Sequence, residues 1–173
     1  MEKYQTLFPR LTAIILDIIL LLPLAIFEQL IKSAEFSPAS KWALFFIINS
    51  AQIIYFIVMH GLYGQTVGKM LMKVKVLNFS EAKINFRQAI IRDLPQILFI
   101  IGSSVFLYPL SLNEIDPNSP DYWKNPFIIL ITVWGVADAI AVLTNEKRRA
   151  LHDYLAGTVV VRINENNENS DAE

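Results

Sequence analysis

The sequence predicts an all-α membrane protein: a four-transmembrane-helix bundle with a small cytoplasmic β-sheet. Four apolar stretches of 19 to 21 residues occur at residues 11–31, 42–60, 94–112 and 126–144. A bilayer core about 30 Å thick requires about 20 residues at a rise of 1.5 Å per residue. Each stretch is therefore long enough to cross the membrane. The charges that flank the stretches predict the orientation in the membrane. Segments outside the stretches in which polar and apolar residues alternate predict the β-sheet.

The composition favours a membrane protein over a soluble one. Hydrophobic residues make up 54% of the 173 residues, and the four stretches contain only three formal charges, at Asp17, Glu28 and Asp138. The chain has no cysteine and two histidines, which excludes disulfides, thiolate zinc sites and cysteine nucleophiles. We expect no metal site and no cofactor.

The basic residues separate between the two sides of the membrane. Of the fifteen lysines and arginines, only Lys32, Lys41 and Lys124 lie in the connections between spans 1 and 2 and between spans 3 and 4. The other twelve lie before span 1, between spans 2 and 3, or after span 4. Cytoplasmic loops carry the excess of basic residues. We therefore expect a multi-pass protein of the inner (plasma) membrane with both termini in the cytoplasm.

Three short cytoplasmic segments have the pattern of β-strands. Residues 72–77 and 83–86 alternate with period two, and residues 158–163 are rich in β-branched side chains. An isolated hairpin is marginally stable, so we expect all three segments to pair in one sheet. Residues 1–163 then form one membrane domain. Residues 164–173 form an acidic tail without apolar periodicity, which predicts disorder.

Several motifs occur at the cytoplasmic ends of the predicted spans. Arg10 begins span 1 and Asp17 lies within it. The segment Gly64-Gln65-Thr66-Val67-Gly68-Lys69 follows span 2, and Arg92 precedes span 3. The segment Arg148-Arg149-Ala150-Leu151-His152-Asp153 follows span 4 and leads into Leu155-Ala156-Gly157-Thr158. From Pro9 to about Arg162 the chain resembles the RDD family of small membrane proteins, named for one arginine and two aspartates.

The resemblance implies roles for individual residues. The name-giving arginine matches Arg10 and the first aspartate matches Asp17, whereas Asp153 and Asp138 are both candidates for the second. The resemblance implies structural roles for the motif residues Arg10, Asp17, Gly64, Gly68, Lys69, Arg92, His152, Asp153 and Gly157. Ion transport has been proposed for some family members, and accessory roles beside other membrane proteins for others.

Asp17 is the most informative single residue of the predicted spans. It lies seven residues beyond Arg10, about 10 Å deeper along a helix. A carboxyl group inside a span costs about 2.5–3.5 kcal/mol on insertion scales, so it normally faces the bundle and has a partner. Asp17 is either a proton or cation site or a buried structural hydrogen-bonding group. Both interpretations remain open at this point.

Arg10 is a poor partner for Asp17 despite the favourable spacing. Side chains on a helix tilt toward its N-terminus, so Arg10 leans toward the cytoplasm and away from Asp17. We expect Arg10 to reach a lipid phosphate or to pair with a cytoplasmic carboxylate such as Asp153. Asp17 then needs a partner from another helix.

Asp138 and Gln52 are the candidate partners of Asp17. Asp138 lies seven residues before Asn145 at the inner end of span 4, and Gln52 lies eight residues before the end of span 2. Both therefore sit near the depth of Asp17, with Asn49 one turn deeper. Two carboxyl groups at one depth can share a proton or hold a cation. The alternative is that one of them faces a sister subunit or lipid.

Other motifs do not indicate catalysis. The Gly64–Lys69 segment has three residues between its glycines, whereas a P-loop needs four, and Met70 stands where Ser or Thr is required. His152-Asp153 has no accompanying histidine cluster, so a hydrogen-bonded turn is the better interpretation. The cytoplasmic lysines favour contact with anionic lipid over nucleic acid.

Two classes of function remain, and neither is enzymatic. The first is a small ion or solute transporter for protons or cations that uses Asp17, Asp138 and Gln52. The alternative is an accessory or scaffold protein that binds another membrane protein. The expected partners are the lipid bilayer and either a second copy of the chain or another membrane protein.

Overall fold

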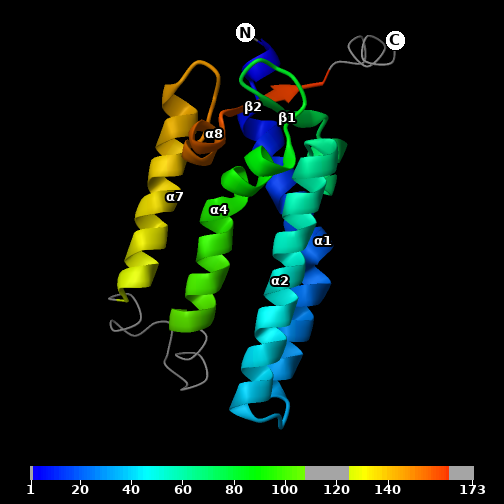
Figure 1. Cartoon of the computed structure of the whole chain (residues 1–173), viewed down its shortest axis with the longest axis vertical. Coiled ribbons are helices and arrows are strands. Elements are labelled where there is room, and N and C mark those ends of the chain that lie inside the picture. The colour runs from blue at the N-terminus through cyan, green and yellow to red at the C-terminus, as the bar shows by residue number, and fades with distance from the viewer. Residues whose placement is uncertain (1, 108–124, 164–173) are drawn as a thin grey trace.

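Four long helices dominate the computed structural model, which describes residues 2–107 and 125–163 (Figure 1). They are α1 (Leu7–Ser33), α2 (Pro38–Tyr63), α4 (Phe86–Gly102), which continues into the π-helical turn η2 (Ser103–Leu107), and α7 (Pro126–Thr144). The short elements gather at one end of the long helices, together with the N-terminus. This sheet end consists of η1 (Glu2–Tyr4), α3 (Val67–Leu71), β1 (Val74–Asn78), α8 (Leu151–Ala156) and β2 (Thr158–Arg162).

The four predicted spans are confirmed as helices that are long and apolar enough to cross a membrane. They cover Leu7–Ser33, Pro38–Tyr63, Phe86–Phe106 and Pro126–Thr144. The third begins at Phe86 rather than at residue 94. The end of the predicted third span, the connection that follows it and the predicted tail at 164–173 fall at positions 108–124 and 164–173, outside the described residues.

The sheet has two strands in the described part of the chain, where three segments were expected. β1 and β2 pair antiparallel, with Val76 opposite Val160. The prediction for residues 83–86 was wrong, because Lys83 makes only a single bridge to Leu77. Helix α4 begins immediately afterwards.

A capping box explains why residues 83–86 do not form a strand. The backbone N–H of Gln88 donates to the side-chain oxygen of Asn85 at 2.8 Å. The backbone N–H of Asn85 donates to the side-chain oxygen of Gln88 at 3.2 Å. This reciprocal pair stabilises a helix N-terminus by satisfying donors that have no partner within the helix. The chain therefore turns into α4 where period-two alternation had predicted a strand.

The tightest packing lies at the sheet end. Val74, Val76, Ile84, Ala89 and Val160 form a buried cluster that includes residues of both strands. The main helix contacts join α2 to α4, α1 to α3, and α4 to α8, while α7 packs mainly on α8. Figure 1 shows α8 between the sheet ends of α7 and α4. Farther from the sheet, α1 and α7 expose large apolar side chains, as helix surfaces facing lipid do.

Candidate functional site

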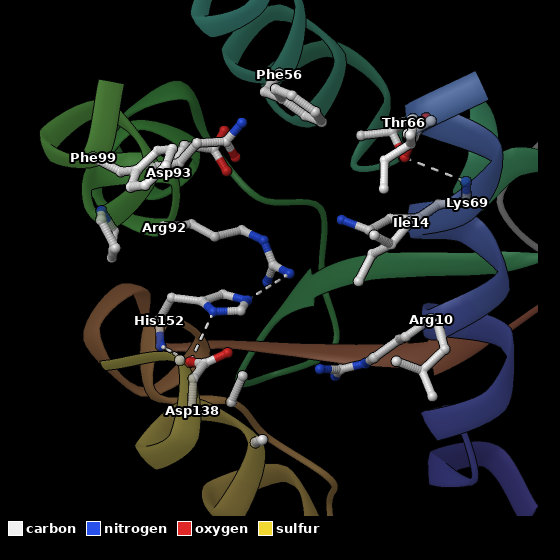
Figure 2. A pocket seen from close by; sticks show the side chains of 18 of the residues that line it. Arg10, Ile14, Phe56, Thr66, Lys69, Arg92, Asp93, Phe99, Asp138 and His152 are labelled. Carbon is white, nitrogen blue, oxygen red and sulfur yellow. Dashed lines mark hydrogen bonds and ion pairs between the residues drawn. The ribbon is translucent and has the colours of Figure 1, made fainter. Parts of the chain in front are cut away.

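A cavity of about 1020 Å³ lies between α1, α2, α4 and α7. Its charged lining is concentrated near the sheet end, whereas the walls farther along the helices are apolar. Figure 2 shows Arg10 of α1, Lys69 of α3 and Arg92 of α4 reaching toward the same space. Several carboxylates and both histidines also line this cavity. Each of these groups has defined protein partners.

Asp17 binds the segment that follows α2. Its carboxylate is buried, with 6% of the residue exposed. One oxygen accepts the backbone N–H of Gly68 at 2.8 Å and the hydroxyl of Tyr55 at 3.2 Å. The other oxygen accepts the hydroxyl of Thr66 at 2.6 Å. Asp17 therefore holds the start of α3 against α1, with three donors meeting one carboxylate.

The two glycines of the Gly64–Lys69 segment make this contact geometrically feasible. A Cβ atom at Gly68 would lie 2.2 Å from the carbonyl oxygen of Ala13, so only glycine allows α3 to approach α1 so closely. Gly64 ends α2 with a φ of 68°, and its carbonyl accepts the backbone N–H of Val76 at 2.8 Å. The segment is thus a structural connection between α1, α2 and β1.

A buried ion triad of Arg10, Asp153 and Arg92 joins α1, α8 and α4. Asp153 is fully buried and accepts Arg10 Nη1 at 2.9 Å and Arg92 Nη1. It also accepts the backbone N–H of Ala150 at 3.0 Å. Burial alone would raise the pKa of Asp153, but Arg92 and Arg10 outweigh burial and hold the pKa below its ordinary value. The Asp153 carboxylate therefore stays ionised at neutral pH.

A second polar chain runs from α3 through α2 to α4. The Lys69 ammonium lies 2.7 Å from His60 Nε2, and His60 Nδ1 lies 2.9 Å from Asp93 Oδ2. If Nε2 accepts from Lys69, then Nδ1 carries the proton and donates to Asp93. Sequence reasoning missed this chain altogether. The adjacent charges of Arg92 and Asp93, in the first turns of an apolar helix, were the signal that could have indicated it.

The third polar contact joins α7 to α8. His152 Nδ1 lies 3.0 Å from Asp138 Oδ1, and the backbone N–H of His152 donates to the same oxygen at 3.3 Å. On the other side of the ring, Nε2 lies 3.3 Å from Arg92 Nη2. Figure 2 shows His152 between Arg92 and Asp138. The Asp138 side chain remains 22% exposed at the cavity wall.

The contacts among Arg10, Asp17, Asp153 and the Gly64–Lys69 segment account physically for the motif residues. A model of the RDD family matches residues 4–157, which is most of the chain. The chain belongs to the RDD family. No curated protein and no solved structure matches the chain. RDD membership, together with four helices of spanning length, supports a membrane protein.

The RDD motif residues lie at the sheet end, and Arg10 pairs with Asp153, one of the two kinds of partner expected for it. Asp17, Gln52 and Asp138 line one cavity, but the hydrogen bonds of Asp17 and Asp138 run to different partners. Asn49 instead donates its side chain to the carbonyl of Phe45 at 2.8 Å. A role for Asp17, Asp138 and Gln52 in carrying ions stays a prediction.

The stability of this RDD protein is expected to depend on pH through Lys69, which lies outside the spans. Burial, followed by the charge of Arg92, lowers the pKa of Lys69 to about 7, whereas an unfolded lysine titrates near about 10.4. Between these values the unfolded chain binds more protons, so the free energy of unfolding rises with pH. We expect the melting temperature in detergent to rise from about pH 7 to about pH 9.

The variant Lys69→Met should reduce this rise, because it removes the group whose pKa differs between the two states. Lys83→Met is the matched control, since Lys83 is exposed at the same end of the molecule. The measurement is the slope of melting temperature against pH. Equal slopes for wild type and Lys69→Met would contradict the prediction.

Proposed function

We propose that this RDD protein is a small proton or cation transporter in which Asp138 and His152 form the carrying pair. The observation that supports the proposal is the position of this pair at the wall of a cavity of about 1020 Å³ between the candidate spans. Histidine changes charge near neutral pH, and a carboxylate beside it can exchange a proton for a cation. We assign no enzymatic reaction to the cavity.

Asp138 suits the carrying role better than Asp17 does. Asp17 is bound by three donors, and a cation would have to displace these donors from its carboxylate. Asp138 is more exposed, and its contacts with His152 converge on Oδ1. Gln52 lines the same cavity from α2 and can contribute a neutral oxygen ligand. The proposed orientation, from the distribution of lysines and arginines, places both termini in the cytoplasm and the protein in the plasma membrane.

Purified protein in proteoliposomes tests the proposal. We expect flux driven by a proton or cation gradient, and we expect Asp138→Asn to abolish the flux without lowering the melting temperature substantially. The amide keeps the shape and one acceptor of the carboxylate but cannot carry the charge. Asp17→Asn is the matched variant and should retain flux. Full flux in Asp138→Asn would remove the pair from the mechanism.

An accessory role is the second candidate, and the packing of α7 favours it. In the described part of the chain α7 packs mainly on α8, and both α1 and α7 expose large apolar side chains. A second copy of the chain or another membrane protein could pack against these helices. Absence of gradient-driven flux in the wild type, together with a stable complex in mild detergent, would favour this candidate.

A further inference from the structure

We infer that the cavity binds one anionic phospholipid, with its phosphate against Arg10 and an acyl chain between α1 and α7. This site is distinct from a diffuse attraction of surface lysines to the bilayer. It is also independent of whether the protein transports ions. Three features support it: an unpaired edge of Arg10, neighbouring cations, and an apolar wall that continues from them.

Arg10 lines the cavity and has a buried hydrogen-bonding edge without an acceptor among the described residues. The side chain is only 11% exposed, and Nη1 is used by Asp153. Within the described residues, Nε and Nη2 are buried without an acceptor. These two N–H groups form one edge of the guanidinium, the edge that binds two oxygens of a phosphate or carboxylate in parallel. Leaving buried donors unpaired is costly, so an oxygen ligand is expected there.

The surroundings of Arg10 favour an anion. Lys69 and Arg92 reach the same space from α3 and α4 (Figure 2). The cavity carboxylates Asp17, Asp93 and Asp138 each have protein partners: Thr66 for Asp17 and a histidine for each of the other two. An anionic headgroup at the sheet end would therefore meet the unpaired edge of Arg10, with Lys69 and Arg92 beside it, while the carboxylates are held by their own partners. The same anion would stabilise the protonated form of Lys69, whose pKa burial otherwise lowers.

The walls beyond the cations match an acyl chain. On α1, Ile14, Ile18 and Ala25 line the cavity in succession beyond Arg10. The fifteen residue steps from Arg10 to Ala25 rise about 22 Å along a helix, which exceeds the half-thickness of a bilayer core, about 15 Å. On α7, Trp134 and Gly135 line the opposite wall. A small free anion would leave this apolar wall uncovered, whereas a phospholipid would cover it.

The arrangement of the helices gives a lipid lateral access. The main packing of α1 is on α2 and α3, and that of α7 is on α8. The cavity thus lies between two spans that are not packed tightly together, with the cations toward the sheet end and the apolar wall farther along the helices. A protein helix could enter the same space, but it would have to supply an acidic group for Arg10. A phospholipid of the surrounding bilayer has that group already.

Native mass spectrometry of the purified protein in detergent tests the site directly. The probes are phosphatidylglycerol, phosphatidylcholine and inorganic phosphate, each added separately. We expect one phosphatidylglycerol to be retained per protein at concentrations where phosphatidylcholine, with no net charge, is lost. Inorganic phosphate should not raise the melting temperature as phosphatidylglycerol does, because it cannot cover the apolar wall.

Two variants test the headgroup part and the acyl-chain part of the proposed site separately. Arg10→Gln removes the free guanidinium edge, and Gly135→Trp fills the apolar part without touching the cations. An added Cβ at Gly135 meets no atom within 4 Å, so the substituted side chain begins in open space. Both should lose the retained lipid. Arg87→Gln is the matched control, because Arg87 is exposed on α4 and does not line the cavity.

Each alternative has its own signature. Equal retention of phosphatidylcholine would refute an anionic headgroup site. Equal loss in Arg87→Gln would indicate diffuse electrostatic attraction, and equal stabilisation by inorganic phosphate would indicate a small-anion site. If Arg10→Gln fails to fold, Gly135→Trp decides: a folded Gly135→Trp variant that still retains phosphatidylglycerol overturns the inference.

Discussion

Asp153→Asn is expected to destabilise the protein by about 3–5 kcal/mol, because removal of one member of a buried ion cluster leaves the others uncompensated. Asp153 is fully buried between Arg10 and Arg92, which come from α1 and α4. Asparagine has nearly the same shape but carries no charge, and its amide would point donors at guanidinium donors. In a chain of this length the melting temperature should fall by about 10 °C in detergent.

Glu81→Gln is the matched control for this prediction. Glu81 pairs with Lys3 near the same end of the molecule, but both side chains are substantially exposed. Exposed pairs contribute about 0–1 kcal/mol, so this variant should melt close to wild type. Equal melting temperatures for the two variants would show that the triad does not hold α1, α4 and α8 together.

The pH dependence of the Asp153 effect follows from the direction of its pKa shift. The folded-state pKa lies below the ordinary value, because Arg92 and Arg10 outweigh the effect of burial. The stabilisation is therefore fully present above about pH 4 and is lost as the pH falls further. The difference in melting temperature between wild type and Asp153→Asn should narrow in that acidic range.

The spans and the direction of the Arg10 side chain were predictable from sequence because both depend on local geometry. Span length follows from the rise per residue, and the direction of Arg10 follows from the tilt of side chains toward the helix N-terminus. The start of α4 is also a local feature, but it depends on the capping residues Asn85 and Gln88 and not on the alternation at residues 83–86. Those two residues determine where the helix begins.

The partners of Asp17 could not be predicted in the same way. The spacing of residues along a helix gives their depth along its axis but not the direction in which each side chain points around that axis. Asp138 and Gln52 matched Asp17 in depth, yet the hydrogen bonds of Asp17 go to Tyr55, Thr66 and Gly68. The last two belong to a segment outside the spans that folds back against α1. Only the close approach of Gly68 to Ala13, a tertiary feature, reveals this arrangement.

Asp17→Leu is expected to destabilise the protein by at least about 3 kcal/mol, because three buried or partly buried donors lose their acceptor at about 1–3 kcal/mol each. The backbone N–H of Gly68 and the hydroxyl of Thr66 would remain enclosed against α1 without Asp17. Thermal unfolding in detergent measures the effect. Gln29→Leu, the same kind of change at an exposed position of α1, should leave the melting temperature nearly unchanged.

Asp17→Asn separates a structural role from an ion-carrying one. The amide oxygen can still accept from Gly68 and Tyr55, and the amide nitrogen can donate to the hydroxyl oxygen of Thr66. We therefore expect a loss of about 1 kcal/mol, well below that of Asp17→Leu, and unchanged gradient-driven flux in proteoliposomes. A variant that melts like wild type but has no flux would instead make Asp17 a carrying group. If Asp17→Leu melted no lower than Asp17→Asn, the three hydrogen bonds would not be what holds α3 against α1.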